Sequence, residues 1–206
     1  AAAFTSGRYS VNELTLQNGG TIGAGFQFDG GGSINITGGI LRNDGLISAS
    51  SAGTLSIIGT LDLDGNTGDG RLEAIQTIGG GVNITSALAD AYDGAATLRE
   101  SNSFTFVSGW SLGSSGSLTF TSNTTNNFDA LVSGGTMTSA GAINVSNDVN
   151  ARIAAPFTMT GGTMSIGTNS EMELDALATF SGGTISGAGT LRTDGDIDVT
   201  GLVNIN

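Results

Sequence analysis

The sequence alternates apolar and polar residues in short triplets that recur along the whole chain. Fourteen triplets of apolar, polar and apolar residues begin at Leu14, Phe26, Ile34, Leu55, Leu61, Val82, Phe104, Leu118, Ile143, Phe157, Met164, Met172, Ile197 and Val203. Such alternation predicts short β-strands that bury one face and expose the other to water. The residues predicted to point inward include Leu55, Ile57, Leu61, Leu63, Val82, Ile84, Ile143, Val145, Met164, Ile166, Met172, Leu174, Ile197 and Val199.

The distances between triplets fall into a longer and a shorter class. The longer steps run from position 34 to 55, 61 to 82, 82 to 104, 118 to 143, 143 to 164 and 172 to 197. The shorter steps lie between them, such as those from position 55 to 61 and from 164 to 172. A coil with about three short strands per turn produces both classes. The predicted fold is therefore all-β: a single-stranded β-solenoid, or parallel β-helix, with about three strands per 21–25-residue turn and with its handedness left open.

A glycine-rich motif recurs between the predicted strands. Residues 134–143 align without gaps on residues 182–191, and shorter copies begin at Gly161 and Gly19. Each copy places Gly-Gly ahead of Thr and an aliphatic residue. Glycine adopts positive φ and allows close backbone approach, and the β-branched Thr favours the strand that follows. The motif therefore predicts the corners of a coil rather than unrelated hairpin turns.

Composition and charge restrict the partners of this chain. Its 206 residues include 35 Gly, 18 acidic residues and six Arg, without Lys, His or Cys, and the net charge is −12. A polyanionic partner such as nucleic acid is therefore not expected. No run approaches the roughly 18 apolar residues of a transmembrane helix. A start at Ala1 rather than Met is typical of a processed secretory precursor or of a piece of a longer chain, and we expect a secreted protein, extracellular or at the cell surface.

We expect a single domain over residues 1–206 with one interruption, at about residues 86–102. That segment is rich in Ala, and Ser86 is placed to cap a short helix that Gly94 would end. A loop that leaves the coil is the alternative. The strand pattern resumes at Phe104.

Two tracts are similar to the repeats of a known class of proteins. The sequences GGTISGAGTLRTDGDIDVTG, at residues 182–201, and GTLSIIGTLDLDG, at residues 53–65, resemble the degenerate repeats of filamentous-haemagglutinin-like adhesins and autotransporter passenger domains. The resemblance implies a secreted bacterial β-helical protein. It covers about two-thirds of the chain and bears on architecture more than on function.

The chain lacks the side chains on which most enzymes rely. Without His, Cys or Lys, only carboxylates remain for acid–base catalysis, and we expect no enzymatic activity. Two acidic rows alternate along the sequence, Glu171, Glu173 and Asp175 and then Asp194, Asp196 and Asp198. Carboxylates two residues apart on a strand lie about 6.6 Å apart, within the range of an inverting glycosidase. The solvated face of a strand explains the same rows, and we favour that interpretation.

Residues 62–73 contain the best metal candidate. Asp62, Asp64, Asn66 and Glu73 occupy positions 1, 3, 5 and 12 of a calcium-binding loop, where oxygen ligands are needed. Thr67 stands where such a loop requires glycine. The residues around Asp62 also match a strand, which would direct its side chain away from an ion. Calcium and a solvated acidic corner are therefore alternatives, and no other cofactor is expected.

The two ends of the predicted coil indicate self-assembly. Phe4, Leu14 and Leu16 belong to the first turn, and Leu202, Val203 and Ile205 belong to the last. Terminal turns of a solenoid carry unpaired backbone groups that another chain can extend. We therefore expect an extracellular structural protein that associates head to tail with itself into a filament or matrix fibre. The alternative is a segment of a surface adhesin that binds glycans or a host protein.

Threonines two residues apart raise one further interpretation. Thr119 and Thr121, or Thr158 and Thr160, would suit a flat ice-binding face if such pairs recurred on one register. The sequence does not place them on one register, and this interpretation is not favoured.

Overall fold

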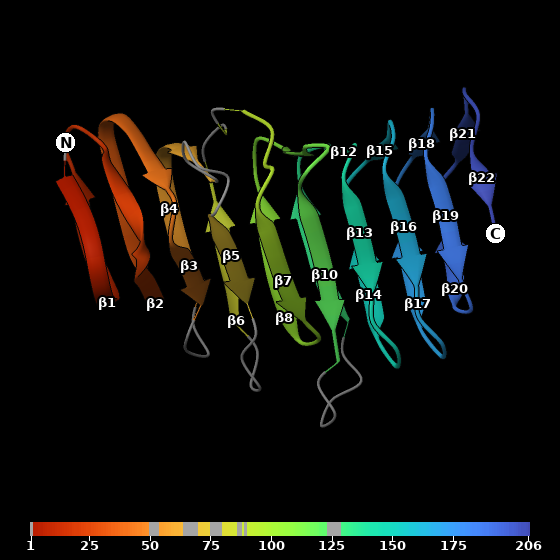
Figure 1. The fold of residues 1–206 in the computed structure, drawn as a ribbon, viewed down its shortest axis with the longest axis horizontal. Helices are drawn as coiled ribbons and strands as arrows, with labels where there is room; N and C mark the ends of the chain where they lie inside the picture. Colours follow the sequence, from red (N-terminus) through yellow and green to blue (C-terminus); the bar gives the residue numbers. More distant parts are fainter. Residues whose placement is uncertain are drawn as a thin grey trace.

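Parallel β-strands form the framework of the protein. A computed structural model describes residues 2–49, 54–63, 70–74, 80–85, 88, 90–122 and 129–206, and none of these residues is helical. The strands wind into about nine turns of roughly 21 residues each, which confirms the predicted β-solenoid. The turns follow one another along the long axis, so the two termini lie at opposite ends of the molecule (Figure 1).

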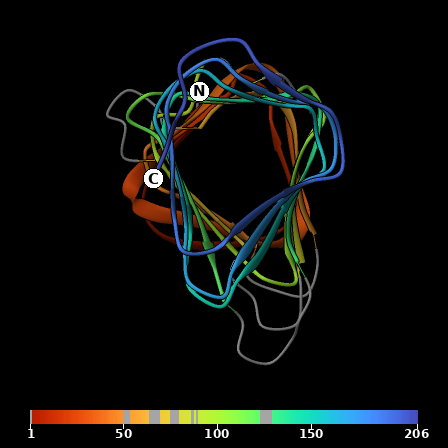
Figure 2. The same cartoon turned by 90° about the vertical axis from the view of Figure 1, so that its right-hand side faces the viewer.

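The strands form three stacks around a central core, as the view along the axis shows (Figure 2). The first stack contains β3 (Leu46–Ala49), β5 (Arg71–Ala74), β7 (Ala95–Arg99), β10 (Ser117–Thr121), β13 (Ala142–Val145), β16 (Thr163–Ile166), β19 (Thr184–Gly187) and β22 (Asn204–Ile205). The second contains β6 (Gly80–Ile84), β8 (Asn102–Phe106), β11 (Ala130–Gly134), β14 (Asn150–Ile153), β17 (Glu171–Leu174) and β20 (Thr190–Thr193). The third contains β9 (Trp110–Leu112), β12 (Met137–Ser139), β15 (Phe157–Met159), β18 (Ala178–Phe180) and β21 (Ile197–Val199).

Three strands near the N-terminus are longer and follow the coil around its corners. They are β1 (Ala2–Leu16), β2 (Gly20–Asn43) and β4 (Thr54–Asp62). β1 pairs with β2 along most of its length. β4 pairs with two separate parts of β2, first at Ser33–Asn35 and then at Ile40–Arg42. β2 and β4 therefore lead into the first and second stacks, because β2 pairs with β3 and β4 pairs with β6.

Alternation along each strand fills the core. The residues predicted to point inward are all buried except Ile197 and Val199, which are 55% and 61% exposed. These two residues pair with Ala178 and Phe180, which are buried, so they lie on the core side of β21. Among the described residues β21 pairs only with β18, and this leaves its other edge and these two side chains exposed.

The turns vary in length more than the sequence predicts. Some predicted steps are true registers, since Val82 pairs with Phe104, Leu118 with Ile143 and Ile143 with Met164. Other longer steps do not join paired residues, because Ile34 pairs with Ile57, Leu55 pairs with Val82, and Met172 pairs with Leu191. Paired residues are separated by as few as 18 positions, from Phe4 to Ile22, and by as many as 28, from Phe104 to Val132. Corners absorb these differences while the strands keep their register.

Glycines occupy crowded corners, as predicted. Gly162 has a φ of +70°, and an added Cβ would overlap the carbonyl oxygen of Gly141 on the preceding turn. The motif copies at Gly161 and Gly182 are one turn apart, because Met164 pairs with Ile185. The copy at Gly134 lies at a different corner, since the strand after it, β12, belongs to the third stack. The repeated motif therefore encodes a corner rather than a whole turn.

The described residues of the segment at 86–102 follow the coil. Leu88 forms an isolated parallel bridge with Leu61, and Tyr92 forms one with Leu112. β7 then begins at Ala95, so the described part of this segment is loop and strand, and the helix interpretation is wrong there. No helix able to span a membrane occurs among the described residues.

One strand offers a direct test of the inward and outward assignment. Ile143 on β13 is 1% exposed, whereas its neighbour Asn144 lies on the outer face. Replacing Ile143 with Asp should lower the free energy of unfolding by roughly 3–5 kcal/mol, because it places an unpaired carboxylate in a thin apolar core. The matched change Asn144→Asp should cost less than about 1 kcal/mol. Urea denaturation followed by circular dichroism measures both, and equal losses would contradict the assignment.

Candidate functional site

The structure describes two of the four predicted calcium ligands, Asp62 and Glu73. Asp64 and Asn66 lie outside the described residues. Asp62 ends β4, and its Oδ2 lies 3.6 Å from Nε of Arg42. Glu73 lies on β5, and its Oε1 lies 3.9 Å from Nη1 of Arg71. The two described carboxylates thus belong to different strands, and each has an arginine close by. The described residues contain no group of three or more side chains able to hold a metal ion.

The two acidic rows also differ from each other. Glu171 and Glu173 alternate with buried residues on β17, and Asp175 follows the strand directly, as the sequence predicts. The second row is not a single strand face. β20 ends at Thr193 and β21 begins at Ile197, so a corner of the coil separates Asp194 from Asp198. Only the first row is therefore a strand-mounted set of carboxylates.

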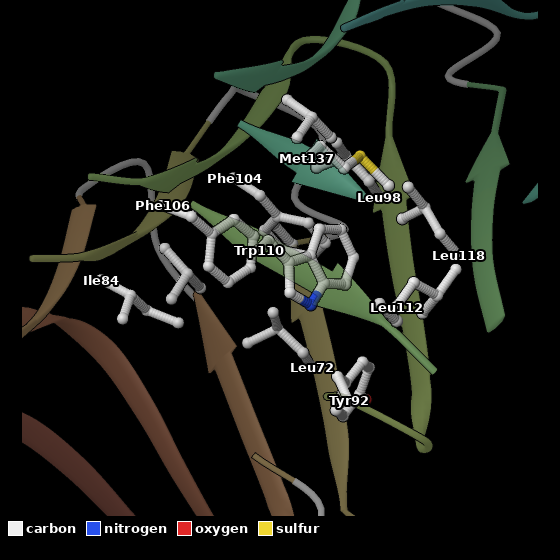
Figure 3. Close-up of a cluster of buried hydrophobic side chains, with 14 of the residues drawn as sticks. Leu72, Ile84, Tyr92, Leu98, Phe104, Phe106, Trp110, Leu112, Leu118 and Met137 are labelled. Atoms are coloured by element: carbon white, nitrogen blue, oxygen red, sulfur yellow. The ribbon is translucent and has the colours of Figure 1, made fainter. Parts of the chain in front are cut away.

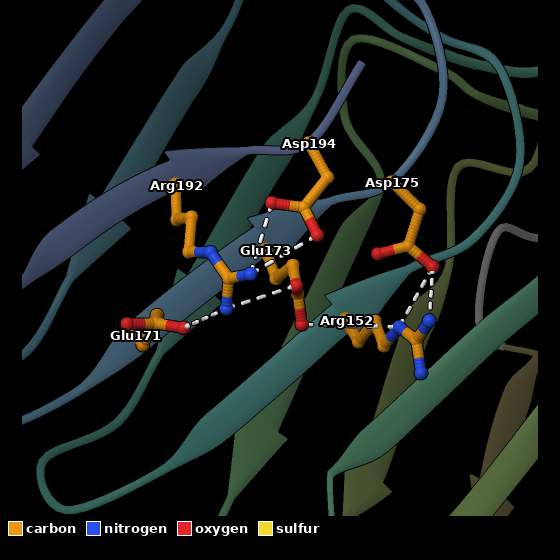
Figure 4. A network of polar contacts seen from close by, with 6 residues as sticks. All are labelled: Arg152, Glu171, Glu173, Asp175, Arg192 and Asp194. Carbon is orange, nitrogen blue, oxygen red and sulfur yellow. Dashed lines mark hydrogen bonds and ion pairs between the residues drawn. The ribbon is translucent and has the colours of Figure 1, made fainter.

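Arginines from the neighbouring turns cover that first row and form a charged ladder with it (Figure 4). The ladder consists of Arg152, Glu171, Glu173, Asp175, Arg192 and Asp194. Register places Arg152 of β14 and Arg192 of β20 on either side of Glu173. Arg152 Nη2 lies 2.6 Å from Asp175 Oδ2, and Arg192 Nη1 lies 3.2 Å from Glu173 Oε1. The ladder therefore connects three successive turns on the outer face of the second stack.

The electrostatics of the ladder centre on Glu173. Burial raises the pKa of Glu173, and the nearby Asp175 and Asp194 raise it further, while Arg192 and Arg152 oppose the shift. The pKa of Arg152 is raised, first by its hydrogen bond with Asp175 and then by the charge of that carboxylate. The charge of Asp194 is the largest cause that raises the pKa of Arg192. Since both carboxylate oxygens of Glu173 face arginines, the arrangement suits ion pairing between turns.

The residues predicted from the sequence do not include the two arginines of the ladder, although a signal was present. Arg152 precedes Glu173 by one turn of the coil, and Arg192 follows it by one turn, so the period itself relates the three residues. Glu100 is a further residue that the sequence did not predict, and no repeat in the sequence relates it to its partner. Its side chain is buried, and Oε1 accepts a hydrogen bond of 2.7 Å from the backbone N–H of Asn150, 50 residues away.

Single threonines align on the third stack, although the Thr-x-Thr pairs share no register, as expected. Thr138, Thr158 and Thr179 occupy equivalent outward positions on β12, β15 and β18. Thr119 lies on β10 in the first stack instead. The pairs Thr119/Thr121 and Thr158/Thr160 therefore do not form one flat face.

The predicted assembly residues divide into two groups. In the first turn, Leu16 is 6% exposed, and the ring of Phe4 packs on Phe26 and Phe28, with centroids 5.3 and 4.9 Å away. Leu14 and Val203 are partly buried against the core. In the last turn, Leu202 and Ile205 are 80% and 79% exposed. The most exposed of the large apolar side chains therefore lie on the last turn, while the N-terminal residues pack largely within the chain.

No protein-family model, curated protein or solved structure matches this sequence.

The raised pKa of Glu173 predicts how the stability of the protein depends on pH. When the pKa of a carboxyl is higher in the folded than in the unfolded state, the group stabilises the fold most at pH values below its unfolded pKa. This stabilisation is lost as the pH rises through the pKa of the folded state. Gln does not ionise, so the Glu173→Gln variant should be at least as stable as the parent at pH 7. The difference in stability between variant and parent should shrink at about pH 3, below the ordinary pKa of Glu.

Urea denaturation at both pH values measures this effect. Glu171→Gln is the matched control, because Glu171 lies on the same strand and its side chain is 40% exposed, compared with 16% for Glu173. A Glu173→Gln variant that loses more stability at pH 7 than at pH 3 would show that attraction to the arginines outweighs burial.

Proposed function

We propose that this chain is an extracellular structural β-solenoid that associates end to end with further copies of itself. The main support is the apolar surface of the last turn, where Ile197, Val199, Leu202 and Ile205 are 55 to 80% exposed. Soluble proteins rarely leave large apolar side chains together on the surface unless something covers them. A hollow of about 160 Å³, lined in part by Ile185, Leu191 and Ile205, adjoins the same surface.

The strand edges support a second copy as the partner. β20, β21 and β22 each pair on one side only, with β17, β18 and β19, within the described residues. In the same described part of the chain, β1 pairs with β2 alone at the opposite end of the molecule. Strand edges accept another strand through backbone hydrogen bonds. Because the two open edges lie on different surfaces at opposite ends, their association is head to tail and produces an open filament.

The alternative proposal is a segment of a surface adhesin. In that case further turns of the same polypeptide would cover the apolar surface, and the lateral faces would contact glycans or a host protein. The resemblance of residues 53–65 and 182–201 to adhesin repeats supports this alternative.

Self-association of the 206-residue chain distinguishes the two proposals. Analytical ultracentrifugation and negative-stain images should show assemblies that grow longer with concentration. Replacing Leu202 and Ile205 together with Asp should abolish growth, because two carboxylates would then have to be buried at the contact. Val107→Asp is the control, since Val107 is 53% exposed after β8 rather than on the last turn.

Circular dichroism should show that each variant keeps the β-solenoid. A parent chain that stays monomeric at high concentration would contradict the filament proposal and favour the adhesin segment. Equal growth of the Leu202 and Ile205 variant and the Val107 variant would show that the last turn is not the contact.

A further inference from the structure

A pocket of about 280 Å³ opens on the outer face of the third stack. Three consecutive passes of the chain along this face contribute to its wall. Asp90 belongs to the first, Ser108 and Ser111 to the second, and Thr136 and Thr138 to the third. β9 is the first strand of the regular five-stranded sheet, whereas Leu88 and Tyr92 before it form only isolated bridges. The hollow therefore lies where regular stacking on this face begins.

The wall of the pocket presents hydroxyl groups and one carboxylate. Each Ser or Thr hydroxyl can donate one hydrogen bond and accept others, and an ionised carboxylate only accepts. Thr138 Oγ1 donates to Ser111 Oγ at 3.0 Å, so these two hydroxyls are already oriented towards each other. Asp90 lies at the surface. Among the described residues that line the pocket there is no arginine. Such a wall matches a neutral ligand that itself carries several hydroxyl groups.

Trp110 gives the pocket a rigid base. It lines the pocket, yet it is only 3% exposed. Its ring stacks on Phe106 with centroids 4.5 Å apart and an angle of 15° between the planes, inside the cluster shown in Figure 3. The position of the hydroxyls on β9 and β12 is therefore fixed by buried packing directly beneath them.

We propose that this pocket binds a neutral monosaccharide unit, whose hydroxyl groups exchange hydrogen bonds with Ser111, Thr138 and Asp90. The volume lies just below the range of roughly 300–1,000 Å³ typical of small-molecule sites, which suits one sugar ring rather than an oligosaccharide. The carboxylate and the net charge of −12 disfavour acidic sugars. The pocket lies on the side of the solenoid, so this proposal stands independently of end-to-end association.

The chain carries its own reporter for this site, because Trp110 is its only tryptophan. Glucose, galactose and N-acetylglucosamine should each be titrated at up to about 100 mM, a range that covers weak millimolar binding. At least one should change Trp110 fluorescence saturably, and saturation-transfer NMR should detect the same sugar. N-acetylneuraminate, which is anionic, should bind at least about tenfold more weakly.

Two variants and one control test the assignment of residues. Thr138→Val and Asp90→Asn should each weaken binding of that sugar by about tenfold or more, since each removes a hydrogen-bonding partner or its charge. Thr158→Val is the matched control, because Thr158 lies beside Thr138 on the next turn but outside the pocket. If the Thr138→Val variant does not fold, the affinity of the Asp90→Asn variant alone tests the assignment. No saturable response by either method, or equal affinity in all variants, would overturn the proposal.

Discussion

Parallel hydrogen bonding between successive turns is the constraint on which the rest of this structure depends. The bonds continue through the corners as well as the strands: the N–H of Thr163 donates to the carbonyl of Gly141, and that of Thr184 donates to Gly162, at 3.2 and 3.1 Å. Turns held this close leave no room for a side chain at several corner positions. The glycine-rich composition is therefore a direct consequence of the stacking.

The same stacking decides which side chains meet on the surface. Residues about one turn apart in sequence become neighbours, as Arg152, Glu173 and Arg192 do in the charged ladder. Ion pairs this exposed contribute little to stability, because water and salt screen them. The raised pKa of Glu173 agrees, since burial outweighs the attraction of both arginines there. We conclude that apolar burial and backbone pairing stabilise the turns, and that the ladder neutralises charges that those turns bring together.

Much of the fold could be predicted from the sequence, because alternation of apolar and polar residues depends only on the strand itself. The turn lengths could not, since all three stacks share one pattern, and a step such as Leu61 to Val82 joins strands of different stacks. The arginines of the ladder become predictable only after the register is known. The contact between Glu100 and Asn150 spans 50 residues and has no local signal. The pocket beside Trp110 depends on an irregular start of the third stack, which residue types do not encode.

Distant surfaces of a solenoid are also largely independent of each other. Each turn contacts only its neighbours, so a change at one end is transmitted weakly to turns further along. The apolar surface of the last turn and the pocket formed by β9 and β12 are separated by the turns that contain β15 and β18. Association at the end would therefore leave the pocket open, and a filament of such units would present the same lateral pocket once per subunit. A ligand with several sugar units would then bind the filament more tightly than a single pocket, because binding at one pocket raises the effective concentration of the ligand at the next.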